Sequence, residues 1–297
     1  MREWKAKVIL QEQTTLGEGP IWWKEEQCLL WVDIEKERVG IYEPTFGRNK
    51  WINIGKHVGC VTPTIHRDRL LIACIDGFHW LEPKTGKINF ITDPEENKRN
   101  NRFNDGKCDP WGNFWAGTMS YEFKVGEGCL WKLNHELKTQ LILDQVTISN
   151  GLAWNKTERL LYFIDSDKKK IASFNLDING DIINKNEDCI VMDQLDCGLP
   201  DGMTIDDEGM LWVAMYGQGC INRWNPKNGE KIGQIKLPCN QVTSCCFGGV
   251  RGNQLFITTA RREMNSEDLK LEPLAGSLFV ADVEVKGPPA VLFKKHV

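Results

Sequence analysis

Short apolar runs bounded by turns recur along the chain at nearly constant spacing. The runs are LLWVD at 29–33, LLIACID at 70–76, NFWAGT at 113–118, LLYFID at 160–165, MLWVAM at 210–215 and QLFITT at 254–259. Their central residues are 41 to 50 positions apart and are Trp31, Ile72, Trp115, Tyr162, Trp212 and Phe256. A polar turn precedes each run, and a second strand follows within a few residues. A repeat of this length predicts one four-stranded antiparallel blade per copy.

Six such copies predict an all-β fold, a six-bladed β-propeller that occupies residues 1–297 as a single domain. An open β-solenoid is the alternative, but a closed ring leaves no exposed sheet ends. No long segment shows a 3.6-residue period, so we expect very little helix. Strands from both termini, around 4–10 and 289–294, are expected to complete one shared blade and close the ring. Trp31, Trp115 and Trp212 occupy equivalent positions and are interpreted as core residues.

Polar side chains stand at matching positions in the strand that opens each of four repeats. They are Glu18, Asn104, Asn150 and Asp201. If the opening strand is the innermost one, these side chains converge at one mouth of the central channel. Two carboxylates and two amides without a histidine favour a hard oxygen site for one divalent ion, with calcium as the first choice and magnesium, manganese or zinc as alternatives. Asn-Gly and Asp-Gly are also common turn dipeptides, so each residue taken alone has a structural interpretation.

The composition excludes some classes of binding partner and indicates a cellular compartment. The formal net charge is −4 with a pI near 5.8, which argues against nucleic acid and acidic membranes as partners. The N-terminus lacks the apolar core of a secretory signal, and no apolar stretch reaches the roughly 20 residues of a membrane span. The 11 cysteines are interpreted as buried thiols in a reducing compartment, and the five histidines show no ligand spacing, which disfavours a histidine-based zinc site. We therefore expect a cytoplasmic protein. A monomer or a weak homodimer is also expected, although nothing in the composition decides between them.

Several segments together resemble the regucalcin (senescence marker protein), gluconolactonase and luciferin-regenerating enzyme family. The matching segments are LGEGPIWW at 16–23, NNRFNDGKCDPWGNFWAGTM at 100–119, ISNGLAWN at 148–155, LLYFIDS at 160–166, PDGMTIDDEGMLWVAM at 200–215 and QVTSCCFGG at 241–249. They span almost the whole chain in the order typical of the family. The resemblance implies a six-bladed propeller that holds one divalent metal ion and opens a sugar lactone such as gluconolactone.

The resemblance also implies roles for individual residues. The metal ligands of the family fall on Glu18, Asn150 and Asp201, and its sugar-binding residues fall on Arg102 and Asn104. A substrate-contacting glutamate falls on Glu122. The sequence GTMSYEF departs here from the consecutive acidic residues of vertebrate members, so the lid at 120–128 and the preferred lactone are expected to differ.

The expected chemistry is metal-assisted hydrolysis of a cyclic ester. Asp201 is the candidate general base, Arg102 and Asn104 would hold the ring hydroxyls, and Glu122 would accept from a distal hydroxyl. Three alternatives stay open: a phosphotriesterase-like hydrolase, a calcium-binding regulatory protein, and a metal with a purely structural role. For Arg102 and Glu122 themselves, the alternatives are an exposed loop arginine and a solvated lid residue.

Overall fold

The computed structural model describes residues 1–192 and 198–294, which form 24 β-strands, one α-helix and one 3-10 helix. The strands make four four-stranded sheets and one eight-stranded sheet. The expectation of very little helix is confirmed, because α1 spans only Ser266–Leu271 and the 3-10 helix η1 only Ser166–Lys168.

The four smaller sheets each run through consecutive strands. The first contains β2 (Gly17–Trp23), β3 (Cys28–Asp33), β4 (Arg38–Glu43) and β5 (Arg48–Asn53). The second contains β6 (Val58–Pro63), β7 (Leu70–Cys74), β8 (Gly77–Leu81) and β9 (Ile88–Thr92). The third contains β10 (Asn101–Cys108), β11 (Phe114–Ser120), β12 (Gly128–Leu133) and β13 (Thr139–Val146). The fourth contains β14 (Ser149–Asn155), β15 (Leu160–Asp165), β16 (Lys170–Leu176) and β17 (Ile182–Val191).

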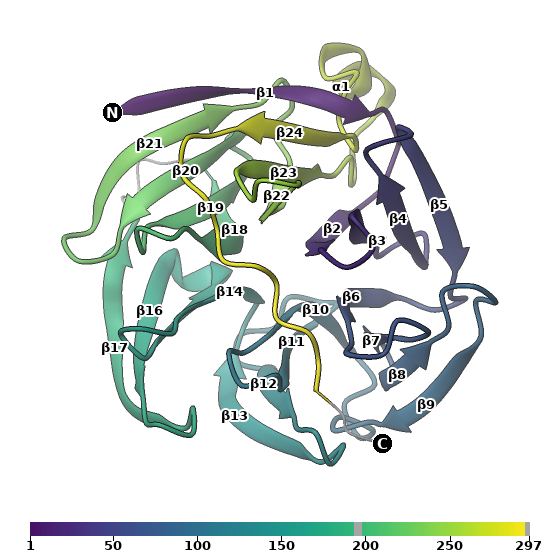
Figure 1. Ribbon diagram of the computed structural model, residues 1–297, viewed down its shortest axis with the longest axis vertical. Helices are drawn as coiled ribbons and strands as arrows, with labels where there is room; N and C mark the ends of the chain where they lie inside the picture. Colours follow the sequence, from purple (N-terminus) through teal and green to yellow (C-terminus); the bar gives the residue numbers. More distant parts are fainter. Residues whose placement is uncertain (193–197, 295–297) are drawn as a thin grey trace.

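The eight-stranded sheet joins two units of four strands. One unit contains β18 (Leu199–Ile205), β19 (Leu211–Tyr216), β20 (Cys220–Asn225) and β21 (Glu230–Lys236). The other contains β22 (Val242–Gly248), β23 (Gln254–Thr259), β24 (Leu278–Asp282) and the N-terminal strand β1 (Arg2–Leu10). Figure 1 shows the sheets arranged like the blades of a propeller around a central axis.

The first strand of each unit lies innermost. Strands β2, β6, β10, β14, β18 and β22 contact one another in ring order, and β22 contacts β2 in turn. All four polar positions singled out in the sequence lie on these strands, which brings residues from the whole length of the chain to the axis (Figure 1).

The N-terminal strand closes the ring. Residues 6–10 of β1 pair antiparallel with β24, and residues 2–5 pair parallel with β21. The expectation for the other terminus is wrong: 289–294 does not add a strand to this sheet. Pro288 and Pro289 have no backbone N–H with which to enter a ladder. The C-terminal segment instead crosses the face of the ring (Figure 1), and Phe293 pairs with Thr64 of the second sheet through an isolated bridge.

The repeated tryptophans belong to the core. Trp31, Trp115 and Trp212 are at most 1% exposed, which confirms the packing interpretation. The indole N–H groups of Trp115 and Trp212 donate to Asp109 and Asp206, at 2.8 and 2.9 Å, in the turns before their strands. In two different sheets, a tryptophan on the second strand therefore donates to the aspartate six residues earlier, which joins the strand to the preceding turn. Within the described part of the chain, no helix is long and apolar enough to cross a membrane.

Candidate functional site

Each of the four inner strands that carry a predicted polar residue has a β-bulge at or directly after that residue. In the β10–β11, β14–β15 and β18–β19 ladders, two residues of the inner strand face one residue of its partner. The first residue of each bulge is Asn104, Asn150 or Asp201. In β2 the bulge falls one position later, directly after Glu18. Bulges bend a strand and redirect side chains, which accounts for four side chains that face the channel from four sheets.

The Asn-Gly and Asp-Gly dipeptides at these positions are not hairpin turns. Gly151 and Gly202 lie inside β14 and β18 and do not have positive φ. A Cβ atom on Gly151 would lie 2.7 Å from the carbonyl oxygen of Asp201, and one on Gly202 would lie 1.9 Å from Ser244 Oγ. Glycine is required here because neighbouring inner strands approach so closely around the axis. The turn interpretation of these two dipeptides is therefore wrong.

The side chains line a cavity of about 270 Å³ at one mouth of the channel. Five of the six predicted site residues line it, namely Glu18, Arg102, Asn104, Asn150 and Asp201. Glu122 does not. Its side chain is 60% exposed and pairs with Lys124 at 2.7 Å, on the loop after β11.

Glu18, Asn150 and Asp201 form a group of oxygen ligands in the cavity wall, in which Glu18 and Asn150 are buried and Asp201 is partly exposed. Burial raises the pKa of Glu18 well above its usual value, and the charges of Asp201 and Asp105 raise it further. Burial and the charge of Asp105 likewise raise the pKa of Asp201. Asn150 Nδ2 donates to Ser166 Oγ at 3.0 Å, while the buried Asn150 Oδ1 has no hydrogen-bond partner. Mutually repelling carboxyl groups beside an unpartnered amide oxygen are a donor set that fits a divalent cation.

A lysine crosses the channel next to this group. Lys107 on β10 donates from Nζ to the carbonyl oxygens of Leu152 at 2.9 Å and Met203 at 2.6 Å, and so joins β10, β14 and β18. Burial raises the pKa of the nearby Asp105, against the lowering effects of Lys107 and of the Gly106 amide. The channel thus holds three carboxyl groups, whose charges Lys107 and one divalent ion would balance.

Arg102 and Asn104 form a further polar part of the cavity wall. Arg102 is 7% exposed, so it is not a loop arginine in solvent. Its Nη1 donates to Asn104 Oδ1 at 2.7 Å and to the carbonyl oxygen of Phe103 at 3.0 Å, and Asn104 Nδ2 donates to the carbonyl oxygen of Ser149 at 2.9 Å. Burial lowers the pKa of Arg102 to about 10, which leaves the guanidinium charged at neutral pH. The cavity wall therefore carries a fixed cation as well as acidic groups.

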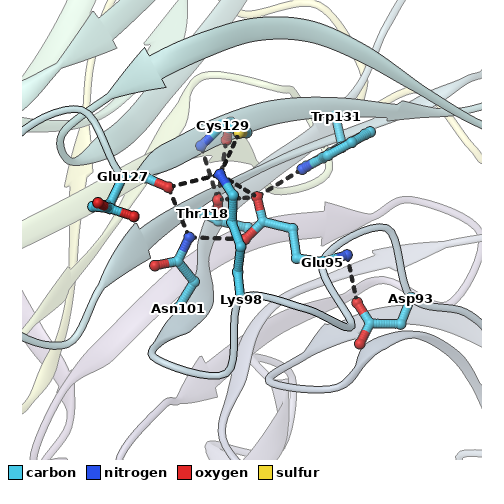
Figure 2. A network of polar contacts seen from close by, with 8 residues as sticks. All are labelled: Asp93, Glu95, Lys98, Asn101, Thr118, Glu127, Cys129 and Trp131. Atoms are coloured by element: carbon cyan, nitrogen blue, oxygen red, sulfur yellow. Dashed lines mark hydrogen bonds and ion pairs between the residues drawn. The ribbon is translucent and has the colours of Figure 1, made fainter.

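A buried network behind β10 fixes the start of that strand (Figure 2). Glu95 accepts hydrogen bonds from Asn101 at 2.9 Å, Thr118 at 3.0 Å and Trp131 at 2.9 Å. Asn101 also donates to the carbonyl oxygen of Glu127, at 2.9 Å. The network connects the loop before β10, the strand β11 and the end of the lid segment. Because Asn101 directly precedes Arg102, it holds the arginine in register with the cavity.

Replacing Glu95 with glutamine is expected to destabilise the protein by about 2 kcal/mol, because the amide turns a hydrogen-bond donor toward buried donors. Loss of register at Asn101 should also raise KM more than it lowers kcat. Thermal unfolding and steady-state kinetics measure the two effects. The exposed neighbour Glu96 provides the control Glu96→Gln, which should change neither quantity. Unaltered stability in Glu95→Gln would contradict this assignment.

The structure adds residues that sequence reasoning missed. Ser166, Tyr216 and Arg262 also line the cavity. Arg262 Nε pairs with Glu35 at 2.7 Å, and the guanidinium lies 5.5 Å from the ring centroid of Phe123 in the lid segment. Ser166 and Arg262 come from connections between strands, and Tyr216 is the last residue of β19; no repeat pattern marks Tyr216 or Arg262. Only Ser166, which directly follows the LLYFID run, stood within a recognised motif.

Together the fold and site define a β-propeller protein with an acidic, oxygen-lined pocket at one mouth of its channel. The chain belongs to the SMP-30/gluconolactonase/LRE-like family, whose model matches residues 16–261. It is 36% identical over 291 residues to the putative sugar lactone lactonase YvrE of Bacillus subtilis (strain 168), covering 97% of this chain and 99% of that protein. It is 37% identical over 288 residues to regucalcin of Danio rerio, covering 96% and 97%.

Solved structures agree with the fold. A calcium-binding protein, regucalcin, from Agrobacterium tumefaciens superposes with a TM-score of 0.93 at 24% identity and 99% coverage of both chains. A luciferin-regenerating enzyme superposes with a TM-score of 0.90 at 29% identity, covering 97% of this chain and 99% of the other. The predicted family is confirmed, and with it the propeller class of the fold.

Proposed function

We propose that the protein is a metal-dependent hydrolase that opens a sugar lactone such as gluconolactone. One observation carries the proposal: a cavity that combines the Glu18, Asn150 and Asp201 oxygen group with the buried guanidinium of Arg102. With the eight-stranded sheet counted as two blades, the ring is a six-bladed propeller with the proposed metal on its axis. The likeness to a putative sugar lactone lactonase supports the same substrate class.

The proposed chemistry divides between the metal and the protein. A divalent ion held by Glu18, Asn150 and Asp201, calcium in first place, would supply a Lewis acid for the lactone carbonyl. Asp201 is proposed to accept a proton from the attacking water, since a carboxylate at the cavity wall lies within reach of both water and substrate. Ser166 Oγ, which donates to the Pro200 carbonyl at 2.6 Å, holds the Asn150 amide in place. Because Asn150 Nδ2 makes this bond, its Oδ1 remains available as a metal ligand.

Substrate orientation is assigned to Arg102 and Asn104. Arg102 uses Nη1 within the protein, and the same guanidinium lines the cavity, where it can donate to ring hydroxyls. A volume of about 270 Å³ lies just below the range of typical ligand pockets, which is about 300–1,000 Å³. It suits a single sugar ring better than a bulky ester. Glu122 remains a proposed contact to a distal hydroxyl, and reaching it requires the lid at 120–128 to move inward.

A panel of substrates tests the proposal. Protein freed of metal and then loaded with calcium, magnesium, manganese or zinc is assayed on gluconolactone, galactonolactone, xylonolactone, arabinonolactone and an organophosphate triester. We expect metal-dependent turnover of at least one lactone, well above that of the triester. Faster turnover of the triester would favour a phosphotriesterase. Metal binding without hydrolysis of any substrate would favour a calcium-binding regulator, consistent with the name of the Agrobacterium structure.

A further inference from the structure

A second group of possible metal ligands lies in the second sheet, away from the channel axis. Cys74 ends β7, Asp76 lies in the turn, and His79 lies on β8. The β7–β8 register pairs Ile72 with His79 and Cys74 with Gly77, so Cys74 and His79 share one face of the hairpin. Gly77 has a φ of 105°, which lets the turn fold Asp76 back over that face. The candidate ligand atoms of the three side chains all lie within 4.8 Å of one another.

The hydrogen bonds of His79 orient its free ring nitrogen toward the aspartate. His79 Nδ1 lies 3.1 Å from the carbonyl oxygen of Gly77, which can only accept, so Nδ1 carries the proton and Nε2 keeps its lone pair. Nε2 faces Asp76 Oδ1 at 3.6 Å. Oδ1 is buried and has no hydrogen-bond partner, while Oδ2 of the same carboxylate binds Lys56 Nζ at 2.6 Å. Two acceptors thus face each other with no proton between them.

The distance between His79 Nε2 and Asp76 Oδ1 fits two ligands of one metal ion better than it fits a hydrogen bond. A nitrogen–oxygen hydrogen bond would measure about 2.7–3.2 Å, which 3.6 Å exceeds. Two ligands bound to one tetrahedral zinc ion at about 2.0–2.1 Å would lie about 3.3 Å apart. A protonated imidazolium is the competing explanation. Burial lowers the pKa of His79, although the nearby carboxylates of Asp76 and Asp93 act in the opposite direction, which disfavours the imidazolium.

The Cys74 thiol is better suited to bind a soft metal ion than to act as a nucleophile. Cys74 is fully buried, and burial raises its pKa, so the free thiol is unreactive at neutral pH. A coordinating metal would deprotonate it outright. One sulfur, one imidazole nitrogen and one carboxylate oxygen form a ligand set for zinc, unlike the all-oxygen group at the channel mouth.

We propose that Cys74, Asp76 and His79 bind one zinc ion, at a site separate from the channel. The ion would fix the β7–β8 hairpin. The hairpin in turn supports the lid, because Ile75 N donates to the carbonyl oxygen of His57, and His57 Nδ1 and Tyr121 Oη are hydrogen-bonded at 2.6 Å. The spacing of the histidines does not reveal this site, because it contains only one histidine. Its ligands follow a Cys-x-Asp-x-x-His pattern across a turn.

Cobalt titration of the metal-free protein tests this proposal, since cobalt replaces zinc and a thiolate ligand gives an intense near-ultraviolet charge-transfer band. Oxygen ligands at the channel mouth give no such band. We expect the band to saturate at one equivalent of cobalt and to disappear when zinc is added. Cys74→Ser should abolish it, and Asp76→Asn, at a half-exposed side chain that should not affect folding, should weaken cobalt binding at least about tenfold.

The matched control is Cys28→Ser, another buried cysteine at a strand end. It should keep the full band at one equivalent. Absence of a band in the wild-type protein would overturn the proposal. So would a band that persists in Cys74→Ser, provided that circular dichroism shows the variant to be folded. Cobalt binding of unchanged affinity in Asp76→Asn would also overturn it. None of these outcomes depends on lactone turnover, so this proposal can fail independently of the proposed function.

Discussion

Asp201→Asn is expected to lower kcat for lactone opening by about three orders of magnitude or more. The substitution keeps the shape of the side chain but removes one charge from the proposed metal site and removes the proposed base. A general base alone contributes about 10²–10⁴-fold. Asparagine should be tolerated structurally, because it removes the Asp201 charge, which after burial is the largest effect that raises the pKa of Glu18. Steady-state kinetics with saturating metal, together with thermal unfolding, measures the effect.

Asp207→Asn is the matched control, because Asp207 is an exposed carboxylate six residues further along the chain, outside the residues that line the cavity. It should retain wild-type kcat and KM. If Asp201→Asn lowers kcat less than about tenfold while remaining folded, Asp201 is neither the base nor an essential ligand. If Asp207→Asn is equally impaired, the loss has no connection with the cavity.

Calcium is expected to raise the melting temperature by about 4 °C when present at 100 times its Kd. Binding at this excess adds about 2.7 kcal/mol to the free energy of unfolding. With an unfolding entropy of about 2.1 cal/mol/K per residue, each 1 kcal/mol shifts the Tm of a chain of this length by about 1.6 °C. Differential scanning calorimetry of the metal-free and calcium-loaded protein measures the shift. Glu18→Gln should remove most of it, because the variant lacks one proposed ligand.

The calcium shift should grow as pH rises. In the metal-free protein the pKa values of Glu18 and Asp201 are raised, so the folded state binds more protons than the unfolded state above about pH 4. The free energy of unfolding of the metal-free protein therefore falls as pH rises from that value through the raised pKa values. Calcium competes with the same protons, so its stabilisation is smallest at pH 5 and largest at pH 8. A calcium shift that is independent of pH would contradict binding at these carboxyl groups.

The repeat spacing was sufficient to predict the propeller, because each blade carries the same apolar run and turn chemistry. The strands that open the six repeats are β2, β6, β10, β14, β18 and β22, and they lie innermost, as the expected convergence of the four polar residues requires. The C-terminal segment was not predictable in this way. It contains apolar residues, and only its two prolines show that it cannot join a ladder.

The candidate site was predictable where the repeat supplies it and not elsewhere. Asn104, Asn150 and Asp201 are the first residues of equivalent bulges, and Glu18 directly precedes the bulge of β2. Their matching positions in the repeats were therefore enough to predict that the four side chains converge. Tyr216, at the end of β19, and Arg262, in the connection after β23, also line the cavity, and no polar pattern shared by the repeats marks them. The Glu95 network is also invisible in the sequence, because it depends on a loop folding back against β11 (Figure 2).

Titration of lactone-opening activity with calcium tests the central claim most directly. Protein stripped of metal by a chelator is assayed on gluconolactone, or on the best lactone of the panel, while calcium is added in steps below and above one equivalent. The proposed function predicts negligible activity without metal and full activity at one bound calcium per chain, with no recovery in Glu18→Gln. Full activity in the chelator-treated protein, or one calcium bound with no lactone opened, would contradict it.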